Sequence, residues 1–140
     1  MYDKVHVDLC RYRLSKAEEY LNDAKKTLDL EMYDTAANRS YYAIFHAVRA
    51  LLALDGKDFK KHSGVISCFQ KDYIKTGVFD KELSNIVKSA FSLRTESDYE
   101  DFFVISREDV VEQVYEAEKF YSEIERYINS CTDSVYDEEP

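Results

Sequence analysis

Only three glycines and one proline occur in this chain of 140 residues. Both residue types interrupt regular structure, glycine because it reaches conformations that other residues avoid and proline because it lacks a backbone N–H. A chain with so few turn formers is expected to fold into a small number of long elements joined by short turns. The sequence therefore predicts an all-α protein, with its helices arranged as an up-and-down bundle.

Apolar residues recur at steps of three and four along five segments, the spacing of one buried helix face. The five expected helices cover approximately residues 4–30, 34–54, 62–77, 81–97 and 106–130. Asp34, Asp80 and Ser106 stand where three of these helices begin, and short polar side chains at such positions cap free backbone N–H groups. The bundle is expected to be one domain over residues 1–130, followed by an acidic, disordered tail at residues 131–140.

The net charge of the chain is −9, and it is unevenly divided. Residues 1–62 hold eleven Lys and Arg against ten Asp and Glu, whereas residues 63–140 hold eight against eighteen. Non-specific affinity for nucleic acids comes from the neutralisation of phosphates by basic side chains, so the composition argues against a general nucleic-acid binder. The N-terminal half can still present a local phosphate site.

The three cysteines, Cys10, Cys68 and Cys131, are odd in number, far apart and without a Cys-x-x-Cys pair. This pattern predicts neither a disulfide framework nor a zinc site. The N-terminus has no apolar run typical of a signal peptide, and no stretch approaches the roughly 18 apolar residues of a membrane span. We therefore expect a cytoplasmic protein with reduced thiols, without a metal, a cofactor or a membrane partner.

The segment NRSYYAIFHAVRALL, residues 38–52, combines polar and apolar residues in an unusual way. On a helix its bulky side chains form one continuous core face, made by Tyr41, Ile44, Phe45, Val48, Leu51 and Leu52. Arg39 and His46 share the opposite face, about two turns apart. Apart from Tyr42, the residues around them on that face are small: Ala43, Ala47, Ala50 and Ala53.

A face of small residues permits the close approach of another helix, which can belong to this chain or to a symmetry-related copy. In a symmetric dimer, Arg39 and His46 of both chains would gather in one cleft, a charge arrangement that suits a phosphate. We expect the interface of such a dimer to include the Ala43–Ala50 face. The alternative interpretation is an ordinary surface ion pair and a satisfied polar contact.

Three stretches resemble the HEPN domain family of prokaryotes, in its small stand-alone branch. They are AANRSYYAIFHAVRALL, KHSGVISCFQKDYIKTGVFDKEL and FSLRTESDYEDF, at residues 36–52, 61–83 and 91–102. The resemblance implies a helical bundle that commonly dimerises, and a motif of Arg followed by His, here Arg39-x6-His46. Ser40 follows the arginine, and the gap of six residues is wider than the four typical of the nuclease form of the motif.

The resemblance implies one of two functions. Many family members resemble metal-independent endoribonucleases, in which the His moves the proton of the 2′-hydroxyl and the Arg steadies the scissile phosphate. His46 and Arg39 would take these catalytic roles here, since histidine titrates near neutral pH whereas arginine keeps its charge. The alternative is a non-catalytic nucleotide-binding or scaffold subunit. In either case the expected partner is a minimal nucleotidyltransferase, within a toxin–antitoxin module.

Four further residues are candidates for binding RNA or a nucleotide. Tyr42 lies on the face of the Arg–His motif, where its ring can stack on a base, and Arg49 continues the same helix. His62 opens the third expected helix beside the basic loop 57–61, and free N–H groups at a helix start bind anions. A helix cap with solubilising lysines explains that pattern as well. Arg94 and Asp98 have the i, i+4 spacing of an ion pair, which would act as a structural clamp beside the cleft.

Overall fold

The computed structural model describes residues 2–99 and 105–137, with side chains described over residues 2–96 and 105–133. These residues form five α-helices and one π-helical turn, with no strand among them. The elements are α1 (Lys4–Asp29), α2 (Tyr33–Leu54), α3 (His62–Phe69), η1 (Gln70–Ile74), α4 (Lys81–Tyr99) and α5 (Arg107–Asp137). The prediction of an all-α bundle is confirmed. Within the described part of the chain, no helix combines the length and apolar composition needed to span a membrane.

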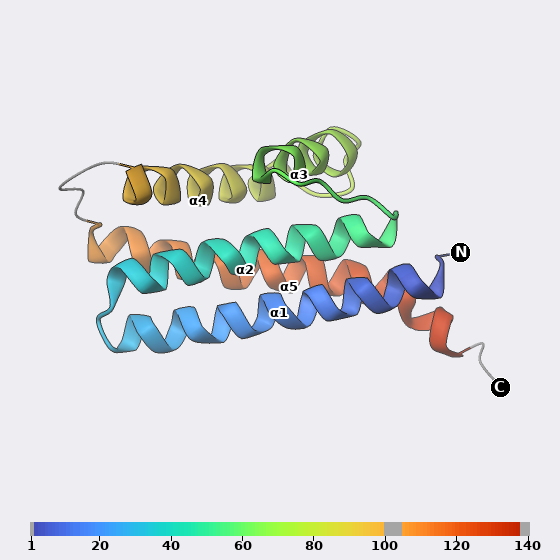
Figure 1. Ribbon diagram of the computed structural model, residues 1–140, viewed down its shortest axis with the longest axis horizontal. Helices are drawn as coiled ribbons and strands as arrows, with labels where there is room; N and C mark the ends of the chain where they lie inside the picture. Colours follow the sequence, from blue (N-terminus) through green and yellow to red (C-terminus); the bar gives the residue numbers. More distant parts are fainter. Residues whose placement is uncertain (1, 100–104, 138–140) are drawn as a thin grey trace.

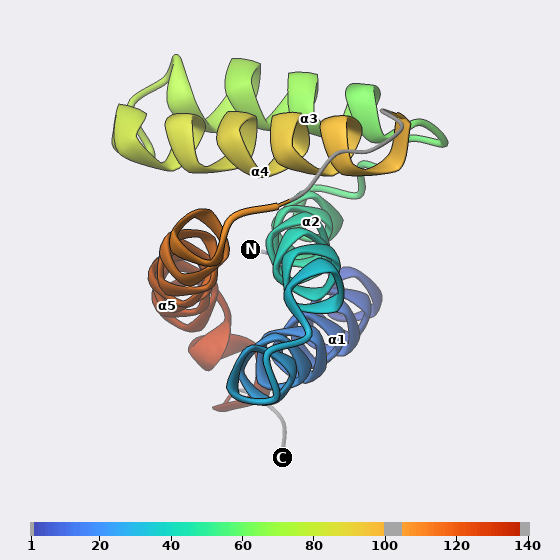
Figure 2. The same cartoon turned by 90° about the vertical axis from the view of Figure 1, so that its left-hand side faces the viewer.

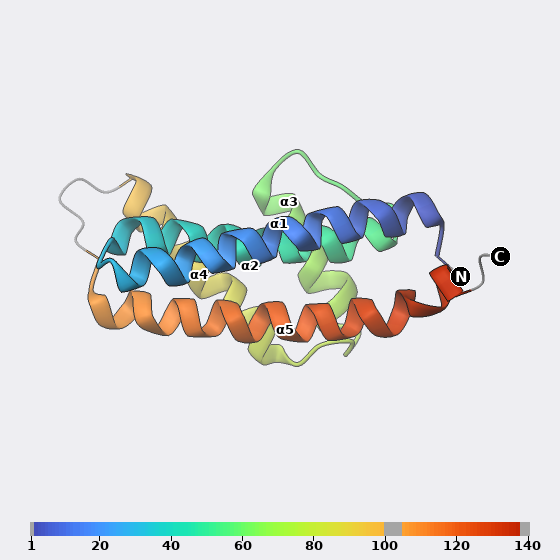
Figure 3. The same ribbon diagram turned by 90° about the horizontal axis from the view of Figure 1, so that it is seen from below.

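The helices form two layers. α1 and α2 make a long antiparallel hairpin, and α5 returns along both of them (Figure 1 and Figure 3). The second hairpin, made by α3 with η1 and by α4, lies across α2 on the side away from α1 (Figure 2). α2 is therefore the central helix, with packed neighbours on several sides, and fourteen of its 22 residues are buried.

The bulky face predicted for α2 is part of the main core. Its six members, from Tyr41 to Leu52, are between 0% and 7% exposed. They pack in one cluster with apolar residues of the other helices, including Phe69, Phe120 and Ile124. A smaller cluster at the other end of the molecule joins α1, α2 and the start of α5. The helical periodicity thus predicted the rotation of α2 correctly.

The small face of α2 does not form a dimer interface. Ala43, Ala47 and Ala50 are each 0% exposed, because they lie inside the bundle that α2 forms with α1 and α5 of the same chain. α1 brings small residues of its own to the core, Ala17 and Ala24, and small side chains allow helices to approach closely. The expected interface on the Ala43–Ala50 face is therefore wrong.

Two of the three predicted helix caps are confirmed. Asp80 Oδ1 accepts a hydrogen bond from the backbone N–H of Glu82 at 3.0 Å, and Ser106 Oγ accepts one from that of Asp109 at 3.1 Å. Asp34 does not cap α2: it lies in the first turn, and no side chain caps this helix. The chain reverses within three residues after α1, held by backbone hydrogen bonds, so α2 begins before Asp34.

α5 continues past the end expected for the domain at residue 130. Thr132 is 0% exposed, and its hydroxyl donates to the carbonyl of Ile128 at 2.8 Å. Arg11 of α1 reaches across to donate hydrogen bonds to Asn129 and Thr132. These polar contacts extend the bundle beyond the apolar stripe from which the domain limit was predicted. The helix ends at Asp137, and residues 138–140 of the predicted tail lie outside the described residues.

Candidate functional site

Five of the six predicted site residues lie together on one side of α2, between α1 and the α3–α4 hairpin. They are Tyr42, His46, Arg49, His62 and Arg94. The ring centroid of Tyr42 is 6.2 Å from that of His46 and 6.1 Å from that of His62. Arg94 Nη2 donates a hydrogen bond to the Tyr42 hydroxyl at 3.3 Å. We call the surface formed by these five residues and Tyr20 the His46 face.

Arg94 connects α4 to the aromatic side chains of α2. Its guanidinium carbon lies 4.9 Å from the ring centroid of Tyr41 and 5.5 Å from that of Tyr42, the geometry of a cation–π contact. Arg94 Nη1 and the Tyr41 hydroxyl also approach His62 Nδ1, at 3.4 and 2.9 Å. Because a guanidinium can only donate, Nδ1 acts as the acceptor and the neutral ring carries its proton on Nε2.

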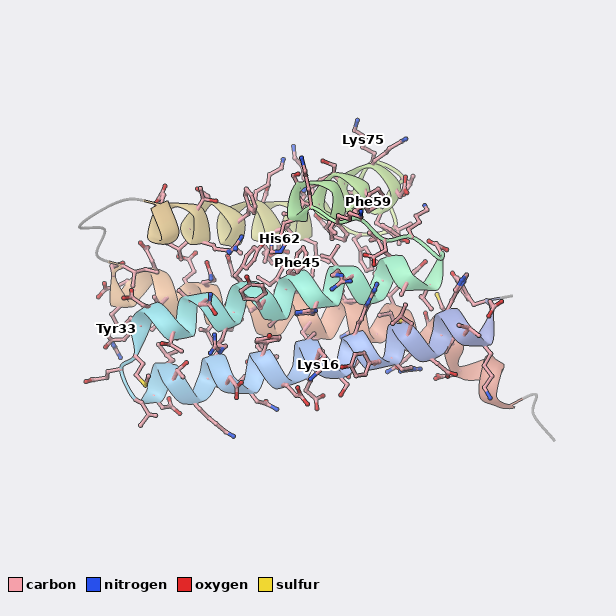
Figure 4. All side chains as sticks on the ribbon, in the orientation of Figure 1. Lys16, Tyr33, Phe45, Phe59, His62 and Lys75 are labelled. Atoms are coloured by element: carbon pink, nitrogen blue, oxygen red, sulfur yellow. The ribbon has the colours of Figure 1, made fainter. Side chains whose placement is uncertain are left out.

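His62, at the start of α3, stacks on the Phe45 ring. Their centroids are 4.0 Å apart, and Figure 4 shows the two side chains meeting between α2 and α3. Burial lowers the pKa of His62, and the charges of Arg94 and Arg49 lower it further. His62 is therefore neutral near pH 7. The contact with Phe45 fixes the orientation of the His62 ring. The sequence had indicated only that His62 is the first residue of a helix.

His46 is the most perturbed histidine of this face. Its ring is parallel to that of Tyr20 on α1, with 2° between the planes and 5.2 Å between the centroids. Its Nδ1 is buried without a hydrogen-bond partner among the described residues. Burial, followed by the charges of Arg49 and Arg13, lowers the pKa of His46 to about 4. The imidazole is therefore neutral at pH 7, the form that can accept a proton.

Arg49 and Arg13 share the carboxylate of Asp58, which lies in the loop before α3. The distances to Asp58 Oδ2 are 3.3 Å from Arg49 Nη2 and 3.1 Å from Arg13 Nη2. Burial acts to raise the pKa of Asp58, but the N–H of Phe59 and the two arginines outweigh it and hold the pKa below its usual value. A paired arginine of this kind fits the simple interpretation of a surface ion pair.

Arg39 lies apart from His46. It donates a hydrogen bond to Asn38, and the largest charge effects on His46 come from Arg49, Arg13, His62 and Lys16. Residues seven apart on a helix are separated by roughly 10.5 Å along its axis. The arginine with the largest charge effect on His46 is therefore Arg49, and Arg39 stands about two turns away along α2.

Two hollows flank His46 along α2. The first has a volume of about 340 Å³ and is lined by Phe45, Arg49, Asp58, Phe59, Lys60 and His62. The second has a volume of about 320 Å³ and is lined by Lys16, Glu19, Tyr20, Asp23, Asn38, Arg39 and Tyr42. Tyr42 reaches from the second hollow to the rings around the first. Four predicted residues therefore line the two hollows, Arg49 and His62 the first and Arg39 and Tyr42 the second, whereas His46 and Arg94 line neither.

This side of the molecule carries more positive than negative side chains. The basic residues here are Arg13, Lys16, Arg39, Arg49, Lys60 and Arg94, and the acidic ones are Glu19, Asp23 and Asp58. The surplus stands out because the whole chain has a net charge of −9. Aromatic rings interleaved with cations are the chemistry that binds single-stranded nucleic acids, through base stacking and phosphate contacts.

Sequence reasoning missed several residues in and beside the two hollows, among them Arg13, Tyr20, Asp58 and Phe59. Arg13 and Tyr20 are seven residues apart, which places them on one side of α1. This spacing could have indicated that the two residues belong to one surface. Asp58 and Phe59 lie in a loop, where no periodicity in the sequence indicates which way a side chain points. The acid predicted to pair with Arg94 is Asp98, whose side chain lies outside the described residues, so that pair stays a prediction.

The described residues contain no group of three or more His, Cys, Asp or Glu side chains placed to hold a metal ion. The thiols of Cys10, Cys68 and Cys131 are free. Burial raises the pKa of Cys68, which donates a hydrogen bond to Asp72, and also raises that of Cys10, to about 12. A raised pKa keeps a thiol protonated and unreactive, so Cys10 and Cys68 act as packing residues.

A family model of the HEPN domain matches residues 10–127 of this chain. A Thermotoga maritima relative named “UPF0332 protein” is 38% identical over 120 residues, which cover 86% of this chain and 91% of the relative. A Methanocaldococcus jannaschii relative named “Putative toxin MJ0142” is 33% identical over 117 residues, 84% of this chain and 80% of the relative. An Archaeoglobus fulgidus relative, also named “UPF0332 protein”, is 32% identical over 123 residues, 88% of this chain and 98% of the relative. The residues that the family model matches include the whole of α2.

Proposed function

The chain belongs to the HEPN domain family, and from this membership and its geometry we propose that it is a toxin-like protein that binds and cleaves single-stranded RNA. The observation that carries the proposal is the neutral imidazole of His46, with a pKa of about 4, set among aromatic rings and arginines in an acidic chain. Such a surface offers stacking for bases, positive charge for phosphates and a group that accepts a proton.

In the proposed reaction His46 takes the proton of the ribose 2′-hydroxyl. This role requires the tautomer with the ring proton on Nδ1, which leaves the lone pair of Nε2 for the 2′-hydroxyl. The 2′-oxygen then attacks the adjacent phosphorus, and the bond from phosphorus to the 5′-oxygen breaks. That oxygen takes a proton from water, and the products are a 2′,3′-cyclic phosphate and a 5′-hydroxyl. No metal takes part in this step.

Arg49 is the residue we assign to the scissile phosphate. It is the first of the charges that act on His46, and its guanidinium already binds an oxyanion, the Asp58 carboxylate. A guanidinium presents a fixed set of donors to phosphate oxygens and does not lose its charge. Arg39, in the second hollow, then holds a phosphate further along the strand. This division of roles revises the assignment that the Arg39-x6-His46 motif suggested.

We also propose the biological setting of this activity. Two relatives carry the word toxin in their names, which supports a place in a toxin–antitoxin module, with a minimal nucleotidyltransferase as the neutralising partner. The three free cysteines favour the cytoplasm. A homodimer remains part of the proposal, but its contacts must lie outside the Ala43–Ala50 face. Sedimentation of the pure protein, and of the protein mixed with its partner, tests both assemblies.

A second candidate function is a non-catalytic nucleotide-binding or scaffold subunit. It is favoured by the separation of Arg39 from His46, and by the low pKa of His46, because a base of pKa about 4 drives proton transfer weakly at neutral pH. The same groove would then bind a nucleotide or RNA without cutting it. The two functions differ in one measurable property, the appearance of cleaved product.

The test is RNA cleavage by the pure protein in the presence of EDTA. We expect wild-type protein to release 2′,3′-cyclic phosphate ends, and His46→Gln to lower the rate by about 10²–10⁴-fold, as for a lost acid–base group. A substrate with 2′-deoxyribose at the scissile position should resist. His6→Gln is the matched control, since His6 lies near Gly56, away from the His46 face. Intact RNA after long incubation with folded protein would support the scaffold function instead.

A further inference from the structure

The hollow between Phe45, Phe59 and His62 has features that a phosphate site alone does not need. It combines three aromatic rings with two cations, Arg49 and Lys60, and one acid, Asp58, in a volume of about 340 Å³. We infer that this hollow binds the base of the nucleotide next to the scissile phosphate, by stacking on Phe59 and on the ring pair of His62 and Phe45. The inference rests on the proposed function, since it assigns part of the same RNA-binding groove.

Phe59 is placed to receive a base. Its side chain is 44% exposed, although it is large and apolar. It leans on the backbone of Gly64, where an added Cβ would lie only 3.1 Å from the Cβ of Phe59. The glycine therefore leaves room for the aromatic side chain to rest against α3. Figure 4 shows Phe59 on the loop that leads to His62 at the start of α3, and Phe59 lines the hollow. An exposed ring held against a rigid element loses little freedom when a base stacks on it.

His62 and Phe45 form the preorganised wall. Their rings lie 4.0 Å apart, and Nδ1 of His62 is held by the Tyr41 hydroxyl at 2.9 Å. Since Nδ1 is the acceptor, Nε2 carries the proton and is a donor available to an oxygen of a base. Stacking tolerates any base because every base has a π face, so the hollow is expected to favour nucleotides in general over a bare anion.

Arg49 makes the hollow continuous with the reaction site. It lines the hollow, and its charge acts on both His46 and His62. A strand whose phosphate binds Arg49 can therefore place its ribose at His46 and the neighbouring base in the hollow. Lys60 adds a second positive charge at the rim. The geometry defines a path for two consecutive nucleotides.

The experiment measures binding of an uncleavable RNA, so it does not depend on catalysis. The probe is a fluorescent 2′-O-methyl octauridylate, compared with an abasic octamer of the same charge. We expect wild-type protein to bind the octauridylate about tenfold more tightly than the abasic octamer, a fold-change typical of one base–aromatic stack. Phe59→Ala should lose most of this preference, whereas Phe59→Tyr, which keeps an aromatic ring, should retain it.

Tyr115→Ala is the control, because Tyr115 is a large aromatic residue of α5 that is 70% exposed and lies outside the hollow. This variant should bind both octamers like wild type. Equal affinity of the wild-type protein for the two octamers, or an unchanged preference in folded Phe59→Ala, would overturn the base-binding assignment without touching the cleavage proposal. If neither octamer bound, the proposed RNA-binding function would fail along with it.

Discussion

The imidazole of His46 lies flat against the phenol ring of Tyr20, with 2° between the two ring planes and 5.2 Å between their centroids. The two residues come from different helices, α2 and α1, and this contact covers one face of the imidazole. It contributes to the burial that is the largest cause of the low pKa of His46. The proton affinity of the central residue of the site is thus set partly by a helix that carries none of the predicted site residues.

Removing the Tyr20 ring should raise the pKa of His46. In Tyr20→Ala the imidazole gains access to water, so its charged form becomes less costly and its pKa moves from about 4 toward the usual value near 6.5. Titration of the His46 ring protons by NMR measures this shift directly. Tyr20→Phe keeps the stacked ring and should leave the titration close to that of wild type. An unchanged pKa in Tyr20→Ala would mean that Tyr20 does not contribute to the burial that lowers it.

The low pKa of His46 should also make the fold less stable in acid. Between about pH 6.5 and pH 4 the unfolded chain takes up a proton at this residue and the folded chain does not, so the free energy of unfolding falls as the pH falls through this range. Below about pH 4 both states are protonated and the loss stops. His62, whose pKa is also lowered, acts in the same direction.

His46→Gln should therefore reduce the acid sensitivity of the fold. Between pH 7 and pH 4.5 we expect the free energy of unfolding to fall by about 1–2 kcal/mol more in wild type than in this variant. This figure takes the partial solvent exposure of the ring into account. Urea unfolding at the two pH values measures the difference, in which the contributions of the carboxylates cancel. Identical losses in the two proteins would contradict the pKa assigned to His46.

Much of the fold follows from the sequence because helical periodicity is a local property. The bulky face of α2 was predicted residue by residue, and the caps at Asp80 and Ser106 followed from residue type and position. What covers the other face of α2 is decided by tertiary packing, which periodicity does not describe. The small residues of this face permit the close approach of a helix from the same chain or from a second copy. In the structure, α1 and α5 of the same chain surround this face.

The candidate site was predictable only where it lies on α2. Tyr42 and His46 share a face that helical geometry specifies, and the structure keeps them together. The positions of His62 and Arg94 depend on how the α3–α4 hairpin crosses α2, and those of Asp58 and Phe59 on the path of a loop. The separation of Arg39 from His46 follows from their spacing of about two turns along the helix, although the motif had suggested that the two residues act together.

Truncation of the core should separate structural residues from site residues. Phe45→Ala and Leu52→Ala remove side chains that are 7% and 1% exposed, and each should cost about 2–5 kcal/mol because the packed interior cannot fully close the cavity. Arg39→Ala should change the free energy of unfolding by less than about 0.5 kcal/mol, as for a surface residue. Urea unfolding of the three variants gives the ranking. A larger loss for Arg39→Ala than for Leu52→Ala would mean that α2 is rotated from the orientation described.

Neutralising Asp58 should strengthen RNA binding. The Asp58 carboxylate now occupies Arg13 and Arg49, the cations nearest to His46, and an RNA phosphate must compete with it. In Asp58→Asn the arginines lose this partner and the groove loses a negative charge, so we expect several-fold tighter binding of an uncleavable octamer at low salt. The gain should shrink at high salt, where electrostatic attraction is screened.

Fluorescence anisotropy at two salt concentrations measures both effects, with Asp29→Asn as a control for the loss of one exposed acid at the end of α1. Equal gains in the two variants would show that only net charge matters, and that Asp58 does not restrain the arginines of the site.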